Sequence, residues 1–345
     1  MDDKSKSLKR LLTGIRPTGP LHLGHYVGAL KQWIPLQDEY ECFFLIADIQ
    51  ALTTHAENPG LIVQAVEDVV LDWVSVGLDP TRSNVHFVLQ SEVRELTELT
   101  VYLGMVTPFT WMERNPTIRE ERKHLKKSAT VGFMTYVVSQ AADILFVSHD
   151  PNQVKSSILV PVGEDQAPHL RDNNRIASAF NKLYGPTFNR CNALIGDVGR
   201  LVGVDGQAKM SKSAGNAINL KDDPETVKNL VMGMFTDPKR TSADVPGTVE
   251  DNPVFIYHDA FNTNVEEVAD LKDRYKKGKV GDVEVKKKLI VALESFLEPI
   301  RARRADAKKN LDTMDVLSSG TARARELAAA TVERTRSAMH LMRLP

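Results

Sequence analysis

Short apolar runs alternate with longer amphipathic segments through the first half of the chain. Each run is bounded by polar or turn residues, which is typical of a strand buried in a parallel sheet. Parallel strands need crossover connections, and the longer segments fit helices of that kind. The alternation therefore predicts an α/β fold. The predicted strands span residues 11–15, 42–47, 85–89 and 158–162, and an amphipathic helix between the second and third covers residues 62–73.

Helical periodicity takes over near residue 220. Residues 222–225 (DDPE) have the acidic cap and first-turn proline of a helix start. A chain of 345 residues exceeds what one simple core usually holds, so we expect a parallel-sheet domain at 1–220 and an all-helical C-terminal domain at 221–345. The helices predicted there span residues 224–234, 265–276, 283–310 and 318–341, and Pro299 is expected to kink or divide the third.

The net charge of −1 hides an uneven distribution of charge. From Leu271 onward there are 18 basic and 10 acidic residues, whereas the preceding part of the chain holds 26 basic and 35 acidic residues. A cationic C-terminal part favours a polyanion such as RNA, because phosphates release counterions when they are bound. A solvated helical surface rich in lysine and arginine explains the same excess equally well.

Cysteine content and hydropathy bear on the compartment. Cys42 and Cys191 are too few for a disulfide framework and lack the CxxC spacing of a zinc or redox site. No apolar run reaches 18 residues, and the N-terminal residues do not resemble a secretory leader. We therefore expect a cytoplasmic protein that neither is secreted nor spans a membrane.

Two short patterns indicate a site for phosphates. Residues 22–25 (HLGH) follow a glycine-rich turn after the first predicted strand and open a helix, where free backbone N–H groups attract anions. His22 and His25 lie on one face, and Gly24 lets a flat purine approach the backbone. Residues 209–213 (KMSKS) follow a second glycine-rich turn and place two ammonium groups on a predicted mobile loop. Either pattern alone also fits an ordinary surface segment.

Together these motifs resemble the histidine and lysine-serine signatures of class I aminoacyl-tRNA synthetases. The resemblance implies a Rossmann-like catalytic domain in which an amino-acid carboxylate attacks the α-phosphorus of ATP, with Mg²⁺ as the usual escort of ATP. The aminoacyl group then passes to a tRNA 3′ hydroxyl. The implied catalytic residues are His22, His25, Lys209 and Lys212. The implied ATP-binding residues are Arg16, Thr18, Gly24, His25, Gly163, Asp165, Lys209, Met210, Ser211 and Lys212.

A polar stripe marks a second part of the expected cleft. Tyr136, Gln140 and Asp143 recur at i, i+4 and i+7 on an otherwise apolar helix. A carboxylate among apolar neighbours accepts a hydrogen bond from a ligand and rejects analogues that lack the donor. The stripe also fits a buried network that joins two elements. Residues 159–166 (LVPVGEDQ) end a strand at the edge where open α/β sheets bind ligands.

These two segments, and most of the chain, resemble bacterial tryptophanyl-tRNA synthetases. The resemblance implies that Asp143 accepts the indole N–H, that Tyr136 and Gln166 bind the α-amino group, and that Gly163 and Asp165 lie against the ribose. It also implies a homodimer, tRNA(Trp) as partner, and a connecting insertion at about residues 105–155. The tryptophan-binding residues expected in full are Gly14, Gln50, Tyr136, Gln140, Asp143 and Gln166.

Several residues depart from the usual pattern of these enzymes. Gln140 fits the related tyrosyl-tRNA synthetases better, whereas the GEDQ segment and the helical C-terminal part favour tryptophan. Leu12, Arg16 and Gln50 replace an aromatic residue, a glutamine and a histidine, so we hypothesise a divergent, auxiliary copy with altered sensitivity to tryptophan-like inhibitors. A tyrosyl-tRNA synthetase, another nucleotidyltransferase with the histidine signature, and a catalytically idle paralogue are the alternatives.

Two groups of basic residues are candidates for contact with phosphates. The cationic C-terminal helices are expected to meet the anticodon arm of tRNA, because counterion release from its backbone favours that contact. The family also places a basic residue in the connecting segment, and several residues of this chain are candidates for that position. The tRNA candidates are Arg301, Arg303, Arg304, Lys308 and Lys309, and the connecting segment offers Arg114, Arg119, Arg122 and Lys123.

Overall fold

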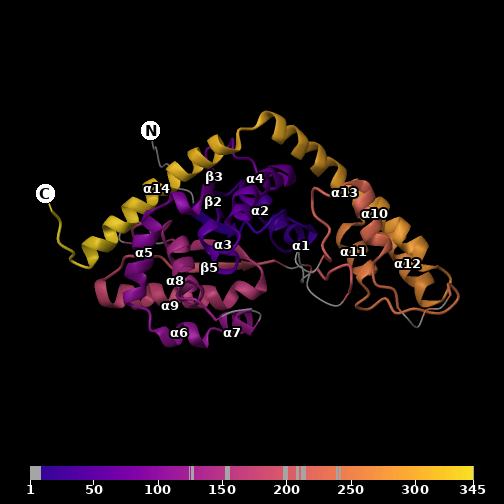
Figure 1. Ribbon diagram of the computed structural model, residues 1–345, viewed down its shortest axis with the longest axis horizontal. Coiled ribbons are helices and arrows are strands. Elements are labelled where there is room, and N and C mark those ends of the chain that lie inside the picture. Colours follow the sequence, from indigo (N-terminus) through magenta and orange to yellow (C-terminus); the bar gives the residue numbers. More distant parts are fainter. Residues whose placement is uncertain are drawn as a thin grey trace, which may run out of the picture.

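Five parallel strands form the sheet of the larger part of the molecule, in the order β3-β2-β1-β4-β5. The computed structural model in Figure 1 describes residues 9–123, 125, 128–151, 156–196, 201–206, 210, 215–237, 240 and 242–344. The chain runs outward from β1 to β3 and then returns beside β1 as β4, so the strand order reverses between β1 and β4. The strands are β1 (Lys9–Ile15), β2 (Tyr40–Ile46), β3 (Val85–Leu89), β4 (Ile158–Val162) and β5 (Cys191–Ile195).

Helices cover both faces of the sheet, which confirms the predicted α/β class. Alternate strand residues point to opposite faces. Phe44 and Phe87 point to one face and pack against Trp33 of α2 (Lys31–Leu36) and Trp73 of α4 (Pro59–Val76). Phe43 and its neighbours on the other face form a separate core with three further helices. These are α5 (Glu95–Met105), α8 (Val131–Leu145) and α9 (Ala167–Tyr184).

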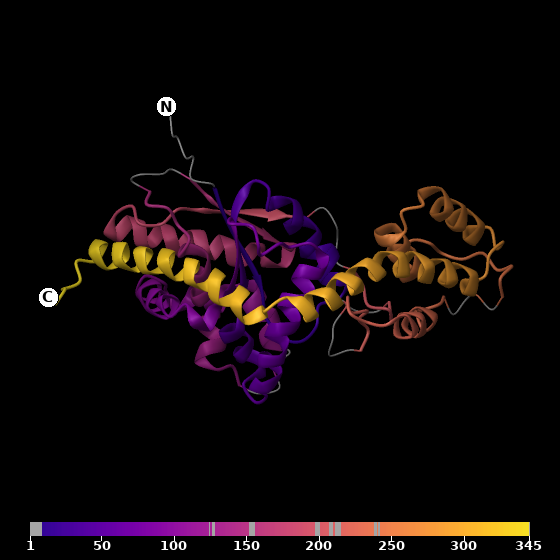
Figure 2. The same ribbon diagram turned by 90° about the horizontal axis from the view of Figure 1, so that it is seen from above.

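The last helix, α14 (Thr313–Ala338), lies along edge strand β3 (Figures 1 and 2). A Cβ atom on Gly320 would lie 2.2 Å from the carbonyl oxygen of Phe87, so only glycine allows this approach. The Thr321 hydroxyl accepts a hydrogen bond from the Leu89 N–H at 3.0 Å. The helix thereby covers a sheet edge that would otherwise expose backbone groups. The predicted helical domain at 221–345 thus sends its last helix across the larger part.

The remaining C-terminal helices form the smaller part of the molecule (Figure 1). They are α10 (Pro224–Met232), α11 (Pro253–Phe261), α12 (Val265–Lys276) and α13 (Asp282–Asn310). The sequence did not predict α11, which begins after the capping side chain of Asn252. Helix α13 continues through Pro299 without being divided. It packs on α4, where Arg304 contacts the buried carboxylate of Asp72 at 2.8 Å.

Short helices complete the larger part. A helical run begins at α1 (Leu23–His25) and continues through a π-helical turn at Tyr26–Leu30 into α2. The others are α3 (Asp48–His55), α6 (Phe109–Arg114) and α7 (Pro116–Lys123). Within the described ranges, no helix is long and apolar enough to cross a membrane.

Candidate active site

A cavity of about 250 Å³ lies at the carboxyl ends of β1, β2 and β4, beside the point where the strand order reverses. Ligands bind at such switch points in open α/β sheets because the connections leave a crevice there. Helices α3, α7, α8 and α9 close the cavity from the sides. Its polar lining includes Arg16, His25, Gln50, Glu121, Tyr136, Gln140, Asp143, Gln166 and His169.

Gly14 lines the cavity at a position where β1 and β2 approach closely. A Cβ atom there would lie 2.3 Å from the carbonyl oxygen of Leu45, so a larger residue would push the strands apart. On the other side of β1, the Thr13 hydroxyl donates to the carbonyl oxygen of Pro161 at 2.7 Å. Leu12 and Gly163 also line the cavity. The strand ends therefore form a closely packed wall.

Asp143 is a buried carboxylate on α8 that faces this cavity. The Gln90 amide donates to both of its oxygens at 2.9 and 2.8 Å, and the Gln50 amide donates to Oδ2 at 2.7 Å. Burial raises the pKa of Asp143 to about 7, although the two amide donors favour the charged form. A carboxylate has about four acceptor positions, so it can also accept a donor from a ligand.

Tyr136 belongs to a second polar network on α8. Its hydroxyl lies 2.9 Å from Oε2 of Glu121 and 3.1 Å from Nε2 of His169. The Asn115 amide in turn lies 3.1 Å from Nδ1 of His169 and donates to Asp172 at 2.7 Å. Burial, followed by the negative charge of Glu121, raises the pKa of Tyr136. The phenol is therefore protonated and acts as a neutral hydrogen-bonding group.

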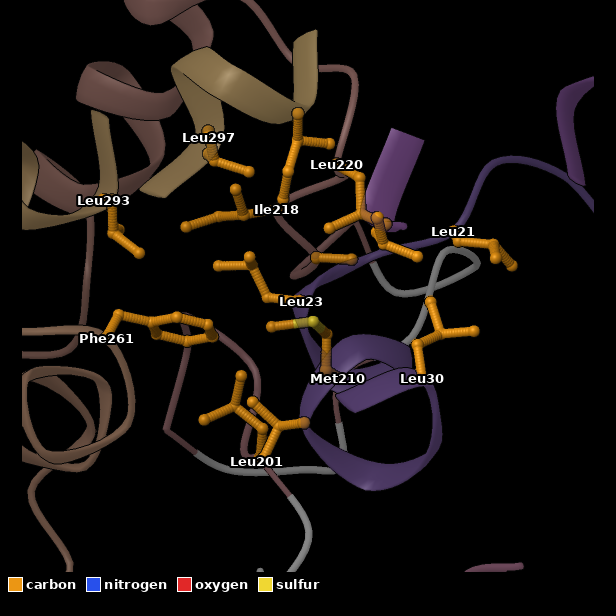
Figure 3. Packing of buried hydrophobic residues seen from close by; sticks show 14 of the residues in the cluster. Leu21, Leu23, Leu30, Leu201, Met210, Ile218, Leu220, Phe261, Leu293 and Leu297 are labelled. Carbon is orange, nitrogen blue, oxygen red and sulfur yellow. The ribbon is translucent and has the colours of Figure 1, made fainter. Parts of the chain in front are cut away.

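The histidine segment forms a different kind of site next to the cavity. The His22 N–H donates to Nδ1 of His25 at 3.1 Å, and His25 lines the cavity. The Gly24 N–H contacts the sulfur of Met210 at 3.3 Å. Figure 3 shows Met210 beside Leu23, in an apolar cluster that extends to the helical part. The backbone of residues 218–220 is hydrogen-bonded to Leu23 and Leu21, each at 2.9 Å.

The structure brings most of the expected site residues to one cavity, with Gly14, Arg16, His25, Gln50, Tyr136, Gln140, Asp143, Gly163 and Gln166 on its lining. Thr18 and Gly24 lie on the loop and helix start beside it. The backbone of Asp165 lies in a short 3-10 turn at Glu164–Gln166. Lys209, Ser211 and Lys212 lie outside the described residues.

Three polar residues at the site were not expected from the sequence. Gln90 follows β3 directly, so its place at a strand end could have indicated it. His169 lies three residues after Gln166, and its place soon after a strand end was a weaker indication of the same kind. Glu121 comes from the connecting segment, where only basic residues were considered. Its approach to Tyr136 depends on how α7 packs beside α8 and α9.

Three of the five basic residues expected to meet tRNA also bind partners within the chain. Arg301 donates to the Asp222 carbonyl oxygen and pairs with Glu294. Arg303 donates to the Ser75 carbonyl oxygen at 2.6 Å, and Arg304 pairs with Asp72 and Asp68. Arg303 and Arg304 hold α13 against α4, and Arg301 contacts the segment that precedes α10. Their contact with tRNA stays a prediction. Lys308 and Lys309 are exposed.

Comparison with known proteins identifies the family to which the chain belongs. Residues 4–298 match the model of the tRNA synthetases class I (W and Y). A tryptophan-tRNA ligase of Treponema pallidum is 47% identical over 344 residues, which cover 97% of this chain and 98% of that protein. A tryptophan-tRNA ligase of Clostridium longisporum is 44% identical over 335 residues, covering 94% and 95%.

Solved structures agree with these matches. A tryptophanyl-tRNA synthetase from Campylobacter jejuni, complexed with ADP and tryptophan, superimposes with a TM-score of 0.82. It is 29% identical in sequence, and the match covers 96% of this chain and 100% of that one. A tyrosyl-tRNA synthetase from Archaeoglobus fulgidus gives a TM-score of 0.62 at 24% identity, over 87% and 91% of the two chains, and shares the fold.

Proposed function

Since the chain belongs to the class I tRNA synthetases for tryptophan and tyrosine, and acts as a tryptophan-tRNA ligase, we propose that its cavity holds tryptophan with ATP across the adjoining strand ends. The tryptophan carboxylate attacks the α-phosphorus of ATP, and pyrophosphate leaves. The resulting tryptophanyl-adenylate then transfers tryptophan to the 3′ end of tRNA(Trp). No side-chain nucleophile is required, so positioning and charge stabilisation supply the catalysis.

The observation that carries the role of the cavity is the setting of Asp143. Its buried carboxylate is held by Gln90 and Gln50 and faces the cavity. We assign it to the indole N–H of tryptophan. Without that donor, a desolvated acceptor position would remain unpaired at a cost of about 1–3 kcal/mol. Tyr136 and Gln166 bind the α-amino group, and Gly14 and Gln140 complete the wall.

The phosphate end is assigned to His22 and His25 together with Lys209 and Lys212. Because Nδ1 of His25 accepts a hydrogen bond from the His22 N–H, the neutral ring carries its proton on Nε2. We assign that proton to a phosphate oxygen of ATP. The two lysines follow the pyrophosphate as it leaves. The further ATP contacts are assigned to Arg16, Thr18, Gly24, Met210 and Ser211, and the ribose to Gly163 and Asp165.

Magnesium enters this scheme together with ATP. Among the described residues, no group of three or more histidine, cysteine, aspartate or glutamate side chains could hold a metal ion. Mg²⁺ usually binds through substrate phosphates and keeps several waters, so a protein cage is not needed. Bound to ATP, it neutralises charge on the phosphates. Arg16 and His25 then act on oxygens of the same phosphate chain.

We place the reaction in the cytoplasm, which two unpaired, buried cysteines support. The protein is proposed to work as a homodimer. In support, Val101 and Met105 lie four residues apart on α5, Phe109 begins α6, and each is more than half exposed. Exposed apolar side chains of this kind favour a protein contact. For tRNA, the exposed Lys308 and Lys309 are the proposed contacts with the backbone of the anticodon arm.

Pyrophosphate exchange tests the proposed function. The wild-type protein, ATP, Mg²⁺ and labelled pyrophosphate are incubated with tryptophan or with tyrosine, and label entering ATP is counted. We expect exchange with tryptophan only, and tryptophan-dependent charging of tRNA(Trp). Exchange with tyrosine would contradict the assignment of the cavity. Absence of exchange with both amino acids would show that the chain does not perform the activation step.

A further inference from the structure

The cavity contains one carboxylate for which the proposed reaction gives no role. Within the described residues, its acidic lining consists of Asp143 and Glu121. Asp143 is almost fully buried, whereas the Glu121 side chain is 33% exposed. Glu121 projects from α7 and lies 2.9 Å from the Tyr136 hydroxyl. A fixed negative charge therefore stands beside the tyrosine assigned to the α-amino group.

The hydrogen bonds around Tyr136 determine the direction of its proton. Oδ1 of Asn115 accepts from the backbone N–H groups of Thr117 and Ile118 at 2.9 and 3.1 Å, so its Nδ2 faces His169. Nδ1 of His169 therefore accepts, and the neutral ring carries its proton on Nε2. That proton is donated to the Tyr136 oxygen, and the phenol proton is left for Glu121.

With the protons of His169 and Tyr136 placed in this way, oxygen acceptors on the cavity lining remain for a ligand. The Tyr136 oxygen has a second lone pair, and Glu121 accepts from the phenol through Oε2 alone. The amide oxygen of Gln166, on the same cavity, has a long contact of 3.4 Å with Gln140 as its hydrogen bond to side chains that the structure describes. An ammonium group has three N–H donors and no acceptor. Tyr136, Gln166 and Glu121 can together accept all three.

Among the described residues, the ion-pair partner of Glu121 is Arg16, and this contact leaves Glu121 partly unoccupied. Arg16 approaches Oε1 of Glu121 at 3.7 Å, beyond hydrogen-bonding distance, and its own side chain is 42% exposed. Exposed pairs of this length contribute little. A substrate ammonium that leaves water for the cavity gains more from a carboxylate than from neutral oxygens, because hydrogen bonds between ionised groups are stronger.

We propose that Glu121 is the anionic partner of the substrate's α-ammonium group, and thus a determinant of which amino-acid-like ligands enter the cavity. The inference rests on the proposed function, because it takes tryptophan as the ligand. Tyr136 and Gln166 orient the ammonium, and Glu121 supplies the opposite charge. The cavity thereby recognises both ends of the substrate with a carboxylate, the indole through Asp143 and the ammonium through Glu121.

Calorimetry with three ligands separates this role from a structural one. Tryptophan carries both the ammonium and the carboxylate, tryptamine only the ammonium, and indole-3-propionate only the carboxylate. In Glu121→Gln we expect tryptophan and tryptamine to bind about 10- to 30-fold more weakly, the size of a lost charge-assisted hydrogen bond at a partly exposed group. Binding of indole-3-propionate is expected to stay within about twofold of wild type, because this ligand lacks the ammonium.

Glu120→Gln is the matched control, since Glu120 lies on the same helix and pairs with Lys123. All three ligands should bind this variant as they bind the wild type. An equal loss for all three ligands in Glu121→Gln would overturn the proposal, because Glu121 would then only hold Tyr136. Unchanged binding of tryptophan would overturn it as well. Failure of the proposed function is distinct, since the wild type would then show no tryptophan-dependent exchange.

Discussion

The two ends of the cavity are built in different ways. The amino-acid end is composed of side chains from α3, α7, α8 and α9, all within the larger part of the molecule. Hydrogen bonds hold Asp143 and Tyr136 in fixed orientations. At the phosphate end, the backbone around His22 is bonded to residues 218–220, and Gly24 contacts Met210. Those partners lie on the connection to the helical part.

This difference matches what each end must do. Selection of an amino acid needs donors and acceptors that do not move, because discrimination comes from leaving a wrong ligand unpaired. Adenylyl transfer needs positive groups that stabilise the charge developing on the transferring phosphorus and the departing pyrophosphate. Asp72 links the phosphate end to the helical part, because its carboxylate accepts hydrogen bonds from the Leu21 N–H and from Arg304. We therefore expect changes at the two ends to have separable effects.

Replacing His25 should have the largest effect and should be confined to the phosphate end. In His25→Ala we expect kcat for tryptophan-dependent exchange to fall by about 100- to 1000-fold, as for loss of one transition-state donor. Tryptophan affinity measured by calorimetry should change little. His55→Ala is the control, because that histidine is partly exposed at the end of α3 and does not line the cavity. A fall in tryptophan affinity as large as the fall in kcat would show that the two ends are not separable.

Arg304→Ala tests the tie between the phosphate end and the helical part. It leaves the buried Asp72 carboxylate without its cation, so we expect the free energy of unfolding to fall by about 3 kcal/mol. Urea denaturation measures this loss. In the folded variant, KM for ATP should rise while tryptophan affinity is kept. Lys308→Ala, on the exposed side of α13, should leave both unchanged. Unaltered stability of Arg304→Ala would show that Arg304 and Asp72 do not link the phosphate end to the helical part.

The pKa of Asp143 predicts how the amino-acid end depends on pH. Burial raises this pKa to about 7, so the folded state holds the proton more tightly than the unfolded chain. The resulting stability is complete below the unfolded pKa near 4 and is lost as pH rises through about 7. In Asp143→Asn the side-chain amide stays neutral throughout this range. The Tm of this variant should therefore fall less than that of wild type between pH 5 and pH 8, and parallel profiles would contradict the prediction.

Gln50→His should have the smallest effect, limited to the amino-acid end. Gln50 donates to Asp143 at 2.7 Å and lines the cavity. We expect the affinity of tryptophan-like inhibitors to change by about three- to tenfold, the size of one altered hydrogen bond. KM for ATP should stay as in wild type. Inhibition assays measure both, and unchanged inhibitor affinity would remove the idea that Gln50 marks a subgroup with altered sensitivity.

The sequence predicted what depends on local pattern. Each of the first four strands contains a compact apolar run, and Asp223 caps α10 as expected. Strand β5 was missed because most of it is exposed at the sheet edge and Asn192 interrupts its apolar run. The position of α14 depends on the fit of Gly320 against β3, which no local pattern indicates.

For the site, the motifs indicated which residues line the cavity but not what holds them. Asp143 was predicted from its place on a polar helical stripe. Its partners Gln50 and Gln90 lie 93 and 53 residues away in the sequence, and the hydrogen bonds form only when the sheet brings their helices together. Arg304 was predicted to meet RNA because its charge is visible in the sequence, whereas its buried partner Asp72 is not recognisable there.

The central claim is that the Asp143 carboxylate selects tryptophan through the indole N–H. Calorimetry with tryptophan and with its benzothienyl analogue, in which sulfur replaces the N–H, tests this claim most directly. We expect wild type to bind tryptophan about 10- to 100-fold more tightly than the analogue. In Asp143→Asn the preference should shrink to about threefold or less, because the charged acceptor is gone. The same preference in both proteins would show that another group recognises the indole N–H.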